Sequence, residues 1–157
     1  MKQFKLLTVL TMIMAIAVMG CDKDDDKNGV GGSAGLECTV DGTAWKATLT
    51  TVATYDGGLL TVTGSDSGGK QCQIVIHDAT APGSFTLGTT MNNQNYGRWT
   101  AGIQPEQSYI NMLGQGGGTV EITELTASGA KGTFEFTAKN TEGDEVTITN
   151  GSFSVIF

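Results

Sequence analysis

The sequence predicts an all-β fold, a single antiparallel β-sandwich or open barrel of about nine or ten short strands that ends in a three-strand meander. From residue 36 onward apolar and polar residues alternate, as they do in strands, and no stretch repeats with the period of a helix. The chain has 23 glycines and only two prolines, which is too glycine-rich for a helical protein. Gly, Asn and Asp separate the alternating runs, as turn residues do.

Residues 1–20 have the composition of a signal peptide. Two lysines precede the uncharged run Leu6–Met19, which is shorter than the ~20 residues that a membrane-spanning helix needs. The run leads into Gly20 and Cys21 and resembles the bacterial lipoprotein signal, in which a small residue precedes a cysteine whose thiol is acylated before cleavage. We therefore expect residues 1–20 to be removed and Cys21 to carry a lipid anchor such as palmitate. An ordinary secretory signal is the alternative.

Residues 21–35 predict a flexible tether that is acidic at first and then rich in glycine. The order cysteine, any residue, Lys23, Asp24, Asp25 resembles the export signal that sends lipoproteins of Bacteroidetes-type bacteria to the outer cell surface. The alternative is a plain tether that leaves the protein on the periplasmic side of the outer membrane of a Gram-negative bacterium. A calcium loop is not expected, because no glycine turn or bidentate Glu follows at the spacing that such a loop needs.

Residues 36–157 predict one β-domain whose strands turn an apolar face inward. The expected inner-face residues are Leu36, Cys38, Val40, Cys72, Ile74, Ile76, Val120, Ile122, Phe134, Phe136 and Ala138. The stretch Asp56–Gly58 predicts a hairpin that sets Val52 opposite Val62. A Pro-Gly pair then precedes a further strand, Ser84–Leu87.

The last third of the chain is specific enough to predict strand register. Asn150-Gly151 is the strongest two-residue hairpin signal, and a three-residue loop over 141–143 precedes it. With these two turns the apolar residues of three successive strands share one inner face, and a one-residue slip would invert that face. The residues set opposite each other are Ile148 with Phe153, Val146 with Val155, Phe136 with Ile148, and Ala138 with Val146.

Two of the three cysteines remain once Cys21 is assigned to the lipid. Cys38 and Cys72 both lie on predicted inner faces of an exported protein, where disulfides form and persist. A bridge between them would close a loop from residue 38 to residue 72, which the chain-entropy model values at roughly 4 kcal/mol. Two buried thiols on strands too far apart to bond are the alternative.

No motif of the sequence requires catalysis, so we expect no enzyme and no cofactor. The stretch Gly64–Lys70 nearly spells a phosphate loop, but Gln71 stands where a magnesium-binding hydroxyl belongs. His77 is the only histidine, which excludes multi-histidine metal sites. A glycan hydrolase is the remaining, least favoured enzyme class, because glycosidases need a pair of carboxylates. The candidates for such a pair are Glu121, Glu124, Glu135 and Asp144.

Four residues form the best candidate for ligand binding: Tyr96, Arg98, Trp99 and Tyr109. They flank an amide-rich stretch over 92–95. Aromatic rings stack on the apolar faces of sugar rings, and amides meet sugar hydroxyls, so this combination suits a glycan. The alternative is that Trp99 and Tyr109 simply fill the core.

The net charge argues against two kinds of partner. The chain has 16 acidic and nine basic residues, and removal of residues 1–20 takes away two of the lysines. Such an acidic surface argues against nucleic acid, whose binders need a basic footprint, and against adsorption to anionic lipid.

Five stretches share a pattern of strands and turns: Val40–Trp45, Pro82–Leu87, Gly118–Ile122, Gly132–Ala138 and Thr149–Phe153. Together they resemble a family of small, uncharacterised lipoproteins of Bacteroidetes-type bacteria. The resemblance implies an all-β domain behind a lipoprotein signal and brings no known catalytic residue. We therefore expect a membrane-anchored binding or accessory module for a glycan, a peptide or an envelope protein. A structural envelope component held by protein partners is the alternative.

Overall fold

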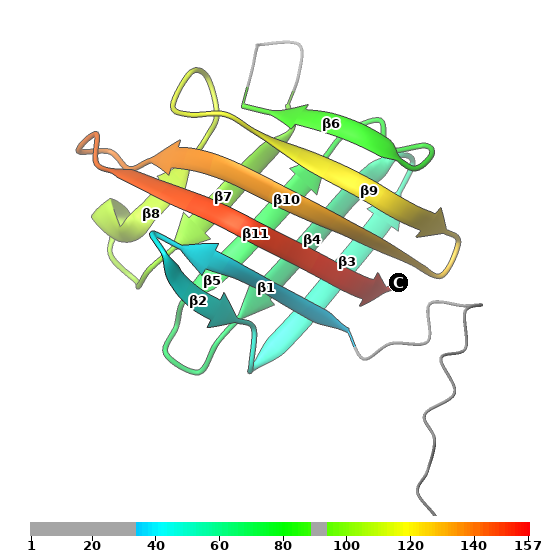
Figure 1. Ribbon diagram of the computed structural model, residues 1–157, viewed down its shortest axis with the longest axis horizontal. Coiled ribbons are helices and arrows are strands. Elements are labelled where there is room, and N and C mark those ends of the chain that lie inside the picture. The colour runs from blue at the N-terminus through cyan, green and yellow to red at the C-terminus, as the bar shows by residue number, and fades with distance from the viewer. Residues whose placement is uncertain (1–33, 89–93) are drawn as a thin grey trace, which may run out of the picture.

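A computed structural model describes residues 34–88 and 94–157, and within them the chain is all β, as the sequence predicts. The residues with predicted lipidation and export roles (Cys21, Lys23, Asp24 and Asp25) lie outside the described residues. The described residues contain eleven strands and one short 3-10 turn (Figure 1). These are β1 (Gly35–Val40), β2 (Thr43–Lys46), β3 (Thr50–Asp56), β4 (Leu59–Ser65), β5 (Gln71–Ile76), β6 (Gly83–Leu87), β7 (Tyr96–Thr100), η1 (Pro105–Gln107), β8 (Ser108–Ile110), β9 (Gly118–Thr126), β10 (Gly129–Lys139) and β11 (Glu145–Ile156).

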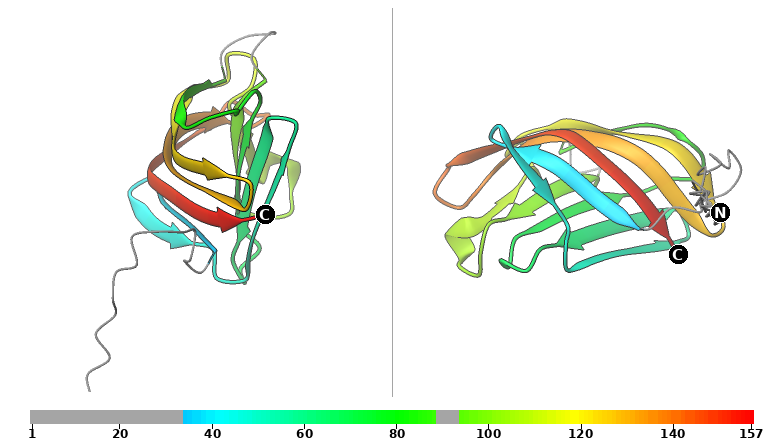
Figure 2. Two further views of the ribbon diagram at one scale, coloured as in Figure 1. Left: turned by 90° about the vertical axis from the view of Figure 1, so that its right-hand side faces the viewer. Right: turned by 60° about the horizontal axis from the view of Figure 1, so that its bottom comes forward.

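The strands form two layers over one core (Figure 2). The front layer of Figure 1 runs in the order β6-β9-β10-β11-β1-β2, and the back layer runs β8-β7-β5-β4-β3. All the paired strands are antiparallel, and the layers join where Lys139 of β10 pairs with Ile110 of β8. The domain is therefore one curled antiparallel sheet, a half-barrel, which agrees with the predicted sandwich or open barrel. In this described part of the chain no helix could span a bilayer.

The inner faces of both layers carry the residues that the alternation predicts. All the predicted inner-face residues are buried except Val40, which is partly buried and packs against the core. Full burial of one Val, Leu, Ile or Phe side chain stabilises a fold by about 1.5–3 kcal/mol relative to its exposure. The alternation therefore identifies the residues that hold the two layers together.

Three phenylalanine rings of this core lie against glycines of other strands. A Cβ atom added at any of these glycines would approach the ring closer than 3.0 Å, so only glycine leaves space for the ring. The pairs are Phe134 with Gly151, Phe153 with Gly132, and Phe136 with Gly97.

The predicted hairpin near residue 57 is present, but its predicted register is wrong by one residue. Gly57 and Gly58, with φ angles of 57° and 88°, form a two-residue turn between β3 and β4 in place of the expected three-residue one. Val62 therefore pairs with Ala53 and not with Val52. Because a shift of one residue reverses the face of a strand, the Val52 side chain points outward and is 56% exposed.

The predicted hairpin at Asn150 and Gly151 is wrong, because β11 continues through both residues. A two-residue hairpin of this kind needs positive φ at both positions, and only Asn150 has it, at 50°. The strand instead forms a bulge, where the register with β10 shifts between Phe134 and Phe136.

The inner face predicted for this segment is nevertheless confirmed. A bulge adds one unpaired residue, so the inward positions change from even to odd numbers across Asn150. Val146 and Ile148 are buried before it, and Phe153 and Val155 are buried after it. The apolar faces are therefore those that the sequence predicts, on one long strand in place of two short ones.

The three-residue loop over 141–143 is confirmed. Gly143 has a φ of 90°, and the backbone N–H of Asn140 donates to the carbonyl of Asp144 at 3.0 Å. The side-chain oxygen of Asn140 also accepts the backbone N–H of Asp144 at 2.8 Å. The loop sets Phe136 opposite Ile148 and Ala138 opposite Val146, as predicted. The C-terminal meander is therefore β9, β10 and β11, and the single strand β11 replaces the last two strands that were predicted.

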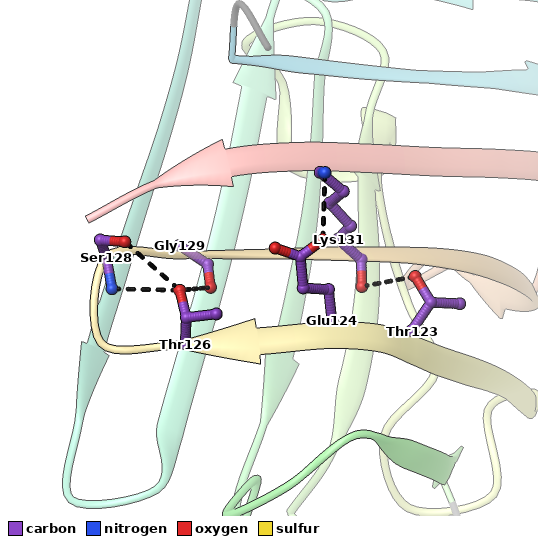
Figure 3. Close-up of polar contacts among 6 residues, drawn as sticks. All are labelled: Thr123, Glu124, Thr126, Ser128, Gly129 and Lys131. Carbon is purple, nitrogen blue, oxygen red and sulfur yellow. Dashed lines mark hydrogen bonds and ion pairs between the residues drawn. The ribbon is translucent and has the colours of Figure 1, made fainter. Parts of the chain in front are cut away.

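The hairpin between β9 and β10 illustrates the charged outer face of the front layer (Figure 3). The Thr126 hydroxyl accepts the backbone N–H of Ser128 at 3.3 Å and donates to the carbonyl of Gly129 at 3.2 Å. Further along, the Lys131 ammonium lies 3.0 Å from the Glu124 carboxylate. One of the four carboxylates considered for catalysis is therefore paired with a lysine.

Candidate functional site

A cleft of about 350 Å³ opens beside the β1–β2 hairpin, where this hairpin faces β7 and β8 of the back layer. Its size falls in the range of about 300–1,000 Å³ that is usual for small-ligand sites. Three large aromatic side chains and two opposite charges distinguish its lining. The lining residues are Val40, Asp41, Thr43, Ala44, Trp45, Lys70, Trp99, Ala101, Tyr109 and Val146.

Three aromatic side chains from different strands make the apolar part of the cleft. Trp45 of β2 and Trp99 of β7 meet edge to face, with ring centroids 5.0 Å apart and planes at 84°. Tyr109 of β8 pairs with Trp99 across the ladder and lines the same cleft. Trp99 is only 3% exposed, whereas Trp45 and Tyr109 are half-buried. The cleft therefore has a buried indole behind two accessible aromatic rings.

A hydrogen bond fixes the Trp45 ring. Its indole N–H donates to Oδ2 of Asp66 at 2.7 Å, while Oδ1 of Asp66 accepts the backbone N–H groups of Gly68 and Lys70 at 2.8 and 3.0 Å. Burial alone would raise the pKa of Asp66, but these hydrogen bonds and the nearby Lys70 ammonium outweigh it and lower that pKa. Asp66 thus stays ionised and ties the glycine-rich turn to the indole.

The rim of the cleft is polar. Asp41, with a φ of 46°, starts the turn between β1 and β2, and its Oδ1 accepts the backbone N–H of Thr147 at 2.8 Å. The Thr43 hydroxyl and the exposed Lys70 complete the polar lining. The cleft can therefore stack a flat apolar surface on its rings while the rim hydrogen-bonds to polar groups of the same ligand.

The four predicted ligand-binding residues do not lie together. Trp99 and Tyr109 point inward to the cleft, but Tyr96 and Arg98 lie on the outer face of β7, because successive residues of a strand point to opposite faces. On that outer face Arg98 Nε donates to the Ser108 hydroxyl at 3.1 Å. The structure therefore divides the predicted cluster between two surfaces.

The amide-rich stretch over 92–95 does not join the cleft either. Residues 92 and 93 lie outside the described residues. Asn95 is buried, and its side-chain oxygen accepts the backbone N–H of His77 at 2.7 Å, while its amide donates to the Thr86 carbonyl at 3.3 Å. Asn95 and His77 thus make a structural contact between β5 and the segment before β7.

Sequence reasoning missed Trp45 and Lys70 as cleft residues. A local signal existed for Trp45: the Asp41-Gly42 pair, with φ angles of 46° and 83°, forms a two-residue hairpin that folds β2 back onto β1. Lys70 lies in the segment that resembles a phosphate loop, and that segment is a turn between β4 and β5. Only the tertiary fold brings this turn to the cleft.

The candidate carboxylates lie away from the cleft. Glu121 and Glu135 are exposed on the front layer, where they line a separate depression of about 460 Å³ over β9, β10 and β11. Asp144 lies in the loop after β10, where its carboxylate accepts the Asn140 amide at 3.3 Å. Among the residues that the structure describes, no three His, Cys, Asp or Glu side chains form a group that could hold a metal ion.

Cys38 and Cys72 are buried and lie in contact as free thiols. Hydrogen bonding with Cys38, burial and the neighbouring thiol together raise the pKa of Cys72 well above its usual value. The Cys72 thiol therefore stays protonated at neutral pH while the domain is folded.

Comparison with known proteins places the chain in a family. The chain matches no curated protein and no solved structure. A family profile described as a domain of unknown function, DUF6252, matches residues 32–156, which includes every strand of the β-domain. The expectation of an uncharacterised family is thereby confirmed, and the chain belongs to the DUF6252 family.

Proposed function

We propose that this protein is a lipid-anchored envelope lipoprotein whose β-domain is a non-enzymatic binding module, with a glycan as its ligand. The anchor is proposed from the signal-like residues 1–20 and from Cys21. The binding role is proposed from the cleft, and one observation carries it: Trp45 stays half-exposed over a buried indole, held in place by Asp66.

The lining of the cleft favours a sugar over a purely apolar ligand. Indole and phenol rings stack on the apolar faces of sugar rings, and a few placed polar groups then fix the orientation. Here Trp45 and Tyr109 offer the accessible rings, and Asp41, Thr43 and Lys70 offer an acceptor, a hydroxyl and an ammonium donor. Both charges are exposed at the rim, where the hydroxyl groups of a sugar can hydrogen-bond to them.

Both tryptophans of the chain line this cleft, so tryptophan emission reports on it directly. We expect emission to change when soluble peptidoglycan fragments, mucin O-glycans or β-glucan oligosaccharides are titrated and one of these classes binds. Trp45→Ala should weaken that binding about tenfold or more, because it removes an accessible stacking ring. Calorimetric titration gives the affinity of each variant independently of emission.

Tyr96→Ala is the matched control, since it removes an aromatic ring of similar exposure from the opposite face of β7. We expect it to leave the affinity unchanged. Loss of binding in Tyr96→Ala, with binding kept in a folded Trp45→Ala, would move the site to the outer face. An absence of binding to all three glycan classes would overturn the glycan proposal.

Display at the cell surface is the second part of the proposal. If Lys23, Asp24 and Asp25 form an export signal, protease added to whole cells should degrade the domain. Replacing all three by alanine should retain the protein beneath the outer membrane and protect it. The protease sensitivity of a soluble periplasmic protein in the same cells controls for leakage. Equal protection of both forms would leave residues 21–35 as a tether only.

A structural role with a protein partner is the second candidate function, and one surface favours it. Within the described residues β3 pairs with β4 alone, so its other edge is free to pair with another chain. Leu49, Val52 and Leu59, which are 69%, 56% and 40% exposed, lie just before or on these two strands. Co-purification of an envelope protein in fixed stoichiometry would favour this role over glycan binding.

A further inference from the structure

The contact between Cys38 and Cys72 joins the two layers of the domain. Cys38 belongs to β1 in the front layer and Cys72 to β5 in the back layer, and they are 4% and 0% exposed. Both side chains belong to the buried core between the layers, where they lie next to each other. A disulfide between strands needs its two side chains to face each other in this way.

A glycine beside Cys72 lets β1 come this close. Gly64 of β4 pairs directly with Cys72. A Cβ atom at Gly64 would lie 2.8 Å from Cβ of Ala47 and 3.1 Å from Cβ of Leu36, the residue two places before Cys38 on the same face of β1. The absence of a side chain at Gly64 therefore lets the two layers approach closely beside the thiols.

The same registers place the thiol pair next to the indole pair of the cleft. Cys38 pairs with Trp45 across β1 and β2, and Cys72 pairs with Trp99 across β5 and β7. Trp45 and Trp99 meet at 5.0 Å. The two layers are thus in contact at two neighbouring places, at the pair Cys38 and Cys72 and at the pair Trp45 and Trp99.

We propose that Cys38 and Cys72 form a disulfide in the exported protein, which joins the two layers directly behind the Trp45–Trp99 pair. Two thiols become one S–S bond and release two protons and two electrons. An oxidised dithiol protein or a small-molecule disulfide accepts these by thiol–disulfide exchange and leaves as two thiols. The cross-link does not depend on what the cleft binds, so either proposal can fail while the other holds.

The burial of both sulfurs determines when the bond forms. Exchange needs a thiolate that can reach the oxidant, whereas in the folded domain both thiols are buried and the pKa of Cys72 is well above its usual value. Oxidation must therefore precede the closing of the layers. By the same argument, reductant reaches the finished bond only when the domain unfolds.

The test uses the protein purified from the envelope of the bacterium that makes it. The sample is unfolded in denaturant without reductant, treated with a thiol-alkylating reagent, and mapped by mass spectrometry of its peptides. We expect the peptides of Cys38 and Cys72 to be unlabelled and joined, lighter by two hydrogen atoms than their sum. They should separate and label fully once reductant is added. Labelling of both cysteines before reduction would overturn the proposal.

Thermal unfolding supplies a second measurement. Reductant should lower the unfolding midpoint of the purified protein by about 10–20 °C, because the bond closes a long loop in the unfolded chain. Cys38→Ala and Cys72→Ala are matched controls that each leave one thiol. Their midpoints should not respond to reductant. An equal response of the natural protein and the two variants would show that reductant acts elsewhere and would contradict the cross-link.

Discussion

Phe153→Ala is expected to lower the free energy of unfolding by about 3–5 kcal/mol, including the cost of the cavity that it leaves. Phe153 is 4% exposed, pairs with Leu36 of β1 and with Gly132 of β10, and rests its ring against that glycine. The void would open between three adjacent strands of the front layer. Denaturant melts of the chain from residue 22 onward measure the loss.

Thr147→Ala is the matched control for this prediction. Thr147 lies on the same strand with its side chain exposed, so its truncation should cost less than about 1 kcal/mol. Its backbone hydrogen bond to Asp41 survives the substitution. If Phe153→Ala does not fold, Phe153→Leu should fold with a smaller loss of about 1–2 kcal/mol. Equal losses from Thr147→Ala and Phe153→Ala would show that the faces of β11 are assigned wrongly.

Cys21→Ser is expected to abolish attachment to the membrane. The proposed anchor acts through about two or three acyl chains, each buried methylene of which contributes ~0.8 kcal/mol, so its removal leaves an acidic domain with nothing to hold it at the bilayer. In a detergent phase-partitioning experiment, the natural protein should be found in the detergent phase and the Cys21→Ser protein in the aqueous phase.

Cys38→Ala is the control for partitioning, because it removes a buried cysteine of the β-domain and should leave the protein in the detergent phase. The length of the chain, read by mass, shows whether residues 1–20 have been removed. A Cys21→Ser protein that keeps residues 1–20 and stays in the detergent phase would indicate a membrane-spanning segment in place of a lipid anchor.

Alternation predicts which residues face the core, but it does not reveal whether the chain turns back. At Asn150 a two-residue hairpin and a bulge both move the inward positions from even to odd numbers. Both therefore bury Ile148 and Phe153, and composition alone favours the hairpin. Only pairing with β1 and β10 on both sides along its length keeps β11 extended.

The same limit explains the one-residue error between β3 and β4. Asp56, Gly57 and Gly58 all suit a turn, so residue types alone do not separate a two-residue loop from a three-residue loop. The structure uses the two glycines and leaves Asp56 as the last residue of its strand. Loop length sets register, and register then decides that Ala53 faces inward while Val52 faces solvent.

The candidate site was predictable only in part, for two different reasons. Trp99 lies on the opposite face of its strand from Tyr96 and Arg98 because side chains alternate along a strand, and their residue numbers alone would have predicted this. The meeting of Trp45 with Trp99 could not, because it depends on how two layers stack across more than fifty residues of chain. The contact between Cys38 and Cys72 likewise depends on how the two layers stack, so it could not be predicted from local sequence either.

The phenylalanine rings that rest on glycines make a prediction about how sequences of this family diverge. At each such contact the two positions share one fixed volume, so neither can change size alone. An alanine at the position of Gly151 should appear only in relatives that carry a smaller residue at the position of Phe134. The same exchange should link Gly97 with Phe136. Substitutions at the two positions of each pair should therefore occur together among relatives. The relation between the two sizes should be kept even where both residues have changed.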